Sequence, residues 1–200
     1  MPRRCVFCGT SCRSFEPDIC EGCSSDIRWC EQLYGNGNLP LDTCAAPLEY
    51  TFPVDAALKA LKFRRRLDYV PAFAELLWRV FNELPADIDA LLPVPLHWRR
   101  HALRGFNQAA ELCGVLHKRS GLRLLSSIRR IRATSFQSGL AADARRRNLQ
   151  HAFAARTRIT ARHVLIIDDV ITTGETCQQL AKVVLAAGAQ KVSALAVARA

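Results

Sequence analysis

The sequence predicts an α/β protein with a parallel sheet flanked by helices, preceded by a small cysteine-rich segment. The run HVLII, residues 163–167, consists mainly of large apolar and β-branched residues, which is typical of a strand covered on both faces of a parallel sheet. Stretches with helical periodicity alternate with such strand-like runs, as in parallel α/β folds. Two C-x-x-C pairs fall near the start of the chain. We therefore expect a cysteine-rich segment over residues 1–45 and the α/β domain over residues 46–200.

The individual elements follow from apolar periodicity and from the turn residues between them. We expect helices over residues 54–63, 71–84, 106–119 and 175–187, and strands over residues 89–95, 163–167 and 191–198. Pro71 would occupy the first turn of its helix, where proline is tolerated, and Gly188 would close the last helix. Cys113 and Cys177 lie on apolar helical stripes, so we expect both thiols in the core.

The composition is that of a globular chain. Of its 200 residues, 50% are hydrophobic, which is enough to bury a core. The first residues lack the apolar stretch of a secretion signal, and no apolar run approaches the length of a membrane span. We therefore predict a cytoplasmic protein, in which cysteines stay reduced and bind metal more often than they form disulfides.

The positive charge is concentrated in the middle of the chain. The formal net charge is +10, but residues 1–94 hold 10 Lys and Arg against 13 Asp and Glu. Residues 95–163 hold 15 Lys and Arg against only two acidic residues, Glu111 and Asp143. Solvated helix faces are the simpler interpretation of such a segment. So few acids favour an anionic partner instead.

The stretch VLIIDDVITTGET, residues 164–176, combines a strand, a loop and a helix start, where open α/β sheets bind ligands. Thr172 and Glu175 fit a capping box, which leaves Asp168 and Asp169 unexplained. Adjacent carboxylates repel one another unless cations or hydroxyl donors face them. A ribose offers two neighbouring hydroxyls, and the turn offers N–H groups and a positive helix end to a phosphate. We predict a site for a ribose 5-phosphate. The P-loop lysine and the glycine spacing of a dinucleotide fingerprint are both absent from this stretch.

This stretch resembles the phosphoribosyl pyrophosphate signature of type I phosphoribosyltransferases. PVPLHWRRHALRGFNQA, residues 93–109, and the N-terminal cysteine pairs narrow the resemblance to the ComF/GntX family, over nearly the whole chain. A spaced pattern adds to it: Arg132, Thr134, Gln137, Leu140, Arg145 and Asn148. Residues 24–45 match least, because many members carry paired cysteines there and this chain has only the separated Cys30 and Cys44. Members of the family are linked to natural competence and to the use of DNA as a nutrient.

The resemblance implies a type I phosphoribosyltransferase-like fold that binds phosphoribosyl pyrophosphate with Mg²⁺. The ribose hydroxyls would be contacted by Asp168 and Asp169. The 5-phosphate would be wrapped by Thr172, Thr173, Gly174, Glu175 and Thr176. The pyrophosphate side would be formed by Pro93, Val94, Pro95, Arg100 and Arg104. Arginine suits that role because its planar fork can bind two phosphate oxygens at once.

Residues 132–148 would, by the same resemblance, form a mobile loop that closes over the reacting carbon. An oxocarbenium-like centre develops there as pyrophosphate leaves, so Mg²⁺ and arginines that stabilise the leaving group matter most. No motif supplies an evident general base. Residues 99–104 also fit a solvated charge run, and Arg145, Arg146 and Arg147 fit solvent and ligand equally.

The N-terminal cysteines form a second group. Cys5-x2-Cys8 and Cys20-x2-Cys23 are separated by eleven residues and supply four thiolates in two tight pairs. Tetrahedral zinc takes four such ligands, and the metal would stabilise a segment with few core residues of its own. A redox C-x-x-C would need a thioredoxin-like βαβ context, which this segment lacks. Cys12 is a spare candidate, and the roles of the other two nearby cysteines stay open.

Two functions of different class follow. One is a phosphoribosyl pyrophosphate-binding protein that acts in DNA uptake or DNA utilisation, with single-stranded DNA on a basic surface and other DNA-uptake proteins as partners. The alternative is an active phosphoribosyltransferase with an unidentified acceptor. The charge of residues 95–163 favours the first, because one polyphosphate ligand hardly requires so large an excess. Within that segment, residues 145–147 are the first candidates for DNA contact.

Overall fold

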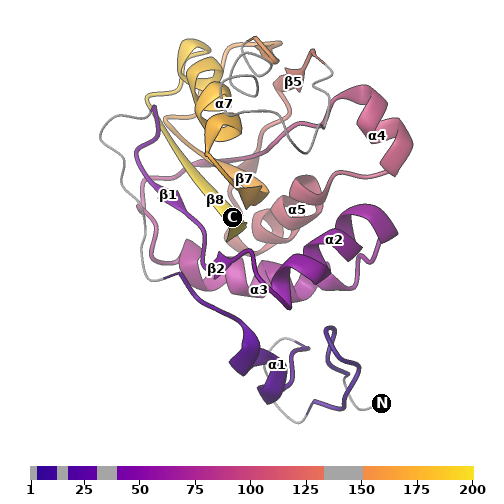
Figure 1. Ribbon diagram of the computed structural model, residues 1–200. Helices are drawn as coiled ribbons and strands as arrows, with labels where there is room; N and C mark the ends of the chain where they lie inside the picture. The colour runs from indigo at the N-terminus through magenta and orange to yellow at the C-terminus, as the bar shows by residue number, and fades with distance from the viewer. Residues whose placement is uncertain (1–3, 13–17, 31–39, 133–150) are drawn as a thin grey trace.

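The computed structural model describes residues 4–12, 18–30, 40–132 and 151–200. It contains a parallel sheet in the order β1-β8-β7-β3-β4, with β2 also paired to β8 (Figure 1). The strands of this sheet are β1 (Cys44–Ala45), β2 (Leu48–Glu49), β3 (Ala90–Pro93), β4 (Arg123–Leu124), β7 (His163–Ile171) and β8 (Lys191–Arg199). A separate antiparallel pair joins β5 (Ile128–Arg130) to β6 (Phe153–Ala155).

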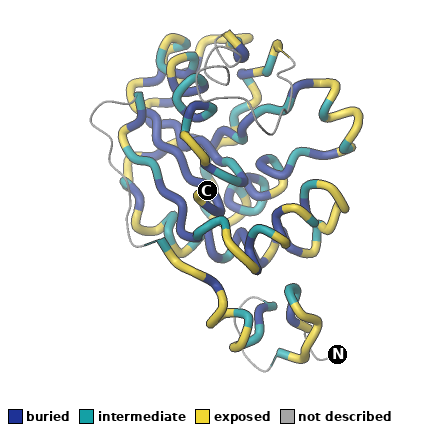
Figure 2. The backbone as a smooth tube through the Cα atoms, viewed as in Figure 1, coloured by how far each residue is buried: buried dark blue, intermediate teal, exposed yellow. Residues whose placement is uncertain are grey.

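Helices cover both faces of the sheet, so the predicted fold class is confirmed (Figure 1). The helices are α1 (Glu21–Asp26), α2 (Val54–Arg64), α3 (Tyr69–Phe81), α4 (Trp98–Arg104), α5 (Gln108–Ser120) and α7 (Glu175–Ala186). One core cluster joins α2, α3 and α5 to Leu165 and Ile167 of β7, and the other joins α7 to Val164 and Ile166. Both faces of the central strands are therefore apolar. Figure 2 shows most residues of these strands as buried.

The predicted helices and long strands are present with small shifts at their ends. Cys113 and Cys177 are both buried, which confirms their place in the core. The helix predicted from Pro71 begins at Tyr69, so Pro71 still lies in the first turn. Helices α1 and α4 and the strands of two or three residues were not predicted from the sequence. The strand predicted over residues 163–167 also extends further than predicted, to Ile171.

β7 extends through the acid pair to Ile171 because its backbone pairing with β8 continues. Asp168 lies opposite Ala196, and Val170 lies opposite Ala198. Side chains alternate between the faces of a strand. Asp168 and Asp169 are therefore directed toward opposite layers of helices.

A buried hydrogen-bonded chain lies at the other end of the sheet. His163 Nδ1 is 2.8 Å from Asp87 Oδ1, and His163 Nε2 is 2.8 Å from Ser193 Oγ. Lys191 and His163 lower the pKa of the Asp87 carboxyl to about 2. The arrangement has the order of a hydrolase triad, but His163 and Ser193 are 1% and 0% exposed. Because Ser193 is enclosed, it cannot contact a substrate. The hydrogen bonds of His163 with Asp87 and Ser193 instead hold the loop before β3 against β7 and β8.

Within the described ranges, no helix is long and apolar enough to cross a membrane.

Candidate ligand site and cysteine cluster

The carboxyl ends of β3 and β7 bring two predicted motifs together. The strands are parallel neighbours with Pro93 opposite Ile167, and the Val94 N–H donates to the Ile167 carbonyl at 2.9 Å. The next residue of β7 is Asp168. The predicted pyrophosphate-side segment and the predicted ribose-side acids thus meet at the edge of the sheet where α/β folds bind ligands.

The connection between α4 and α5 is fastened to the same edge. Gly105 ends α4 with a φ of 74°, in the left-handed region that glycine adopts readily. Asn107 then caps α5 by accepting from the Ala109 N–H at 3.1 Å, while its Nδ2 donates to the Val94 carbonyl at 3.0 Å. This side chain holds the start of α5 against the end of β3. The motif of residues 93–109 therefore forms one continuous wall of the site.

The two acids occupy different environments. Asp169 accepts a hydrogen bond from Lys62 of α2, with Nζ 3.1 Å from Oδ2. Asp168 is directed toward the α7 side, where its charge helps to raise the pKa of Cys177. Burial first, and then the charge of Asp169, raise the pKa of Asp168 well above its ordinary value. A buried, repelled carboxylate of this kind is poised to accept hydroxyl donors or a cation.

Arg104 and Arg130 interact electrostatically with the acid pair, and Arg100 interacts with both of these arginines. Burial lowers the pKa of Arg104, and Asp169 partly offsets this effect. Burial and the charge of Arg100 lower the pKa of Arg130 to about 10, and Asp168 acts in the opposite direction. Cations crowded so closely favour a ligand with several negative charges.

Sequence analysis missed Lys62 and Arg130. Lys62 belongs to the basic run of residues 62–66, but the net negative charge of residues 1–94 concealed that run. Arg130 lies in β5, whose three residues show no strand period long enough to detect. Counting charges around the end of each predicted helix would have identified Lys62. No local pattern in the sequence indicates Arg130.

The turn between β7 and α7 differs from the predicted capping box. Gly174 is the N-cap, with a φ of 74°, so the N-cap position has no side chain, and the Glu175 N–H donates to Thr173 Oγ1 at 3.5 Å. Glu175 is buried and accepts a hydrogen bond from Gln179 Nε2 at 2.8 Å. Thr172 and Thr173 are exposed. The turn therefore presents its hydroxyls and the positive end of α7 to solvent, as an anion site requires.

We expect Asp168→Asn to raise the melting temperature at neutral pH. The pKa of Asp168 is raised in the folded chain, so its ionised form destabilises folding. That penalty acts above the raised pKa and vanishes as the pH falls toward the ordinary carboxyl value. A gain of about 0.5–2 kcal/mol is typical of stabilising substitutions, or roughly 2–4 °C per kcal/mol for a chain of this size.

Thermal unfolding followed by circular dichroism across pH tests this effect. The advantage of the variant should shrink in acid. The control Asp55→Asn, which removes a partly exposed carboxylate of α2 that pairs with Lys59, should show no such gain. A lower melting temperature of Asp168→Asn at neutral pH would contradict the assigned penalty.

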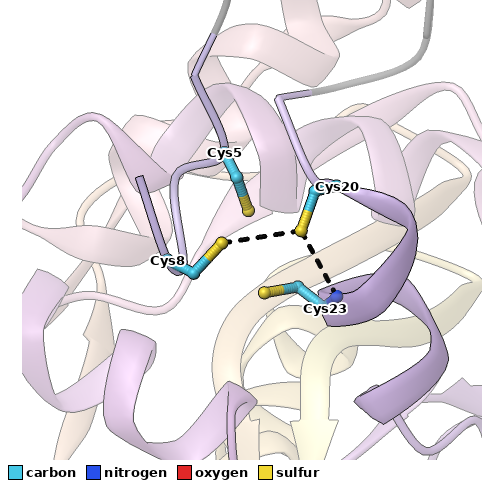
Figure 3. A group of neighbouring side chains, drawn as sticks. All are labelled: Cys5, Cys8, Cys20 and Cys23. Atoms are coloured by element: carbon cyan, nitrogen blue, oxygen red, sulfur yellow. Dashed lines mark hydrogen bonds between the residues drawn. The ribbon is translucent and has the colours of Figure 1, made fainter. Parts of the chain in front are cut away.

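Four predicted ligands gather in the cysteine cluster, Cys5, Cys8, Cys20 and Cys23 (Figure 3). Their Sγ atoms all lie within 4.8 Å of one another, and those of Cys8 and Cys20 are 3.5 Å apart. Zinc–sulfur bonds of about 2.3 Å in a tetrahedron place sulfurs roughly 3.8 Å apart. The four thiols therefore fit a structural zinc ion. Cys12 lies outside this group of four.

The thiols of the cluster are unequally acidic. Hydrogen bonds with Thr10, and then with Cys20 and Cys23, lower the pKa of Cys8 to about 6. Burial raises the pKa of Cys23, and its three neighbouring thiols raise it further. Zinc binds thiolates, so the metal must displace a proton most firmly held by Cys23.

The cysteine cluster packs against the sheet domain through aromatic contacts. The Phe7 ring lies 5.7 Å from the Tyr69 ring and 6.3 Å from the Phe73 ring, both in α3. Ile19 and Ile27 join the core cluster on the same side of the sheet. The segment thus contributes apolar residues to the main core.

The residues predicted for the closing loop and for DNA contact are not all placed. Arg132 is described, whereas residues 133–150, which include Arg145, Arg146 and Arg147, lie outside the described residues. Their predicted roles are therefore carried by the sequence alone.

No protein-family model matches the chain. Among curated proteins, DNA utilization protein YhgH of Salmonella typhi is 33% identical, over 96% of this chain and 95% of its own length. The chain belongs to the ComF/GntX family. DNA utilization protein YhgH of Escherichia coli O157:H7 is 39% identical over 72% of this ComF/GntX chain and 66% of its own length. Competence protein F of Haemophilus influenzae is 29% identical over 98% of this chain and 90% of its own length.

The chemistry available to this ComF/GntX member is that of binding a polyanion that also carries hydroxyls. Carboxylates stand at the end of β7, arginines face them from α4 and β5, and the α7 end faces solvent. The carboxylates can accept hydrogen bonds from hydroxyl groups. The arginines and the N–H groups at the start of α7 can bind phosphate oxygens.

Proposed function

We propose that this ComF/GntX member binds phosphoribosyl pyrophosphate at the carboxyl edge of its sheet and acts in DNA utilisation or competence. The ligand proposal rests on one observation: Pro93, at the end of β3, is paired with Ile167 of β7, and Asp168 is the next residue of β7. The two predicted parts of the ligand site are therefore neighbours. The relatives named for DNA utilisation and for competence support the cellular role.

In this proposal each part of the ligand meets a chemically matched group. The ribose hydroxyls donate to Asp168 and Asp169, and the 5-phosphate accepts from the turn of residues 172–176 at the start of α7. The pyrophosphate lies along residues 93–95, where Arg100 and Arg104 bind its oxygens. Binding of the ribose would displace Lys62 from Asp169, because a hydroxyl donor then takes its place.

Two metals accompany the proposal. Mg²⁺ would be bound with the pyrophosphate, whose charge it neutralises. Zinc would be held by Cys5, Cys8, Cys20 and Cys23, and its role is to stabilise the fold of residues 1–45. The proposed boundary near residue 45 separates this segment from the domain that holds the ligand.

The basic surface supplies the proposed contact with single-stranded DNA. Residues 95–163 hold 15 Lys and Arg, and such an excess attracts phosphates without regard to base sequence. Turnover by a phosphoribosyltransferase is a second candidate, favoured by the arginines beside the acid pair, since they could stabilise a departing pyrophosphate. Pyrophosphate release in the presence of candidate bases and amines would support this second function.

We expect Arg145→Ala/Arg146→Ala/Arg147→Ala to weaken the binding of single-stranded DNA and to reduce its salt dependence. Each phosphate neutralised on a single strand contributes about 0.7 to the log–log slope, so the slope should flatten by up to about 2 units. Fluorescence anisotropy of a labelled oligonucleotide across a salt series measures this. The control Lys182→Ala removes an exposed cation from α7, outside the basic segment.

Phosphoribosyl pyrophosphate should compete with DNA if arginines of residues 132–148 serve both ligands. No binding of DNA to the unaltered chain at low salt would contradict the DNA part of the proposal. Calorimetry of phosphoribosyl pyrophosphate with the same protein tests the other part independently.

A further inference from the structure

Helix α4 has no buried residue, a property that it shares only with the short α1 among the described helices. Surface helices normally bury an apolar stripe, which supplies most of their stability. Here Trp98 and Leu103 are 66% and 87% exposed, and Phe63 at the end of α2 is 67% exposed. In Figure 2 exposed residues run along both helices. Large apolar side chains left in solvent on two adjoining helices indicate a binding surface.

Each exposed ring on this surface carries an arginine. The Arg99 guanidinium carbon lies 5.3 Å from the centroid of the Trp98 ring, and that of Arg104 lies 5.3 Å from the centroid of Phe63. The second pair joins α4 to α2 directly. The Arg65 side chain also lies at this junction, beside Gly105 at the end of α4. Its Nη1 would be 3.8 Å from the Cβ of an alanine placed at residue 105.

The charge of the surface is of one sign. The segments KALKFRRR, residues 59–66, and WRRHALR, residues 98–104, contain no acidic residue. The acids that pair with cations of these segments are Asp55 with Lys59, Asp68 with Arg66, and Asp169 with Lys62. Aromatic rings set among cations match the platforms on which single-stranded nucleic acids stack their bases.

We propose that Phe63, Arg65, Trp98 and Arg99, the α2–α4 face, bind single-stranded DNA by stacking its bases on the two rings. This inference rests on the proposed DNA binding and assigns it a second mode of contact, distinct from the phosphate contacts of residues 145–147. Charge complementarity selects the occupant, because the arginines beside the rings meet the phosphates that flank each stacked base.

The same mixture of side chains continues around α2. A cavity of about 430 Å³ lies between the cysteine cluster and α2, and its lining includes Phe52, Tyr69, Arg64 and Arg66. Phe52 is 73% exposed at its rim. A strand that stacks on the α2–α4 face therefore finds further rings and cations along its path toward the cysteine cluster.

The test separates bases from phosphates. An oligodeoxythymidine and an abasic oligonucleotide of equal length are titrated against the unaltered chain and Phe63→Ala/Trp98→Ala. Loss of stacking should weaken the binding of the first by about 5- to 150-fold for each ring removed. Binding of the abasic strand should change little, and the salt slope should stay the same because no cation is removed.

Leu103→Ala is the matched control, because it removes an exposed apolar side chain from the same helix without removing a ring. An equal loss with Leu103→Ala would show general apolar docking, as for a protein partner, and would overturn the proposal. Unchanged oligodeoxythymidine binding by the double variant would overturn it as well, while leaving the proposed DNA binding intact. If the unaltered chain binds neither oligonucleotide, the proposed DNA binding fails, and the stacking surface fails with it.

Discussion

Asp168→Asn/Asp169→Asn is expected to lose most of its affinity for phosphoribosyl pyrophosphate while keeping its fold. A hydrogen bond to a charged group contributes about 1.5–3 kcal/mol, so each lost carboxylate should weaken binding by roughly tenfold or more. The two effects need not add, because neighbouring residues are coupled. Isothermal titration calorimetry with Mg²⁺ present measures the change.

Asparagine is the right replacement because the Asp169 N–H donates to Asp168 Oδ1 at 2.8 Å. An amide oxygen can still accept that bond, so the end of β7 keeps its local geometry. Asp55→Asn is the control, since it removes a carboxylate of α2 that pairs with Lys59 outside the site. Unchanged affinity in the double variant would rule out the assigned ribose contacts.

Cys20→Ser is expected to release the zinc that the purified chain should carry in a ratio of about one. Structural zinc contributes about 10–16 kcal/mol in small zinc-binding peptides at neutral pH, so the N-terminal segment around the cysteine cluster should loosen. The parallel sheet should remain, because β7 and β8 are buried by helices on both faces. Metal analysis and limited proteolysis distinguish the two parts.

Cys12→Ser is the matched control, because Cys12 is a nearby thiol outside the cluster of four. It should retain the metal and resist proteolysis as the unaltered chain does. Absence of zinc from protein prepared without chelator would contradict the assignment. Global unfolding of Cys20→Ser would instead show that the contacts of Phe7 with α3 make the cysteine segment part of the main core.

The elements that could be predicted from the sequence are those with a long local pattern. The apolar runs of β7 and β8 and the periodic helices α3 and α5 identify themselves without knowledge of their neighbours. β1, β2 and β4 are two residues each, and they exist because longer strands pair with them. α4 carries no apolar period because it buries no residue. Such elements depend on tertiary contacts and leave little trace in the sequence.

The site residues also divide into those predicted from a local motif and those that depend on tertiary contacts. Residues 93–109 and 164–176 were predicted from their own motifs, and the pairing of β3 with β7 brings them together. Lys62 was missed because its partner Asp169 lies far along the chain. The cysteine cluster was predictable because zinc ligation requires a fixed local spacing.

The unequal lengths of β3 and β7 have one further consequence. β3 ends at Pro93, opposite Ile167, whereas β7 continues to Ile171 with β8 alongside. Within the described part of the chain, the last residues of β7 therefore pair with a strand on one side only. The Asp169 N–H donates to the Asp168 side chain. A ligand seated in this notch would act as the missing neighbour of the strand. It could bond to main-chain atoms as well as to carboxylates, so part of its recognition would persist whatever side chains evolution placed there.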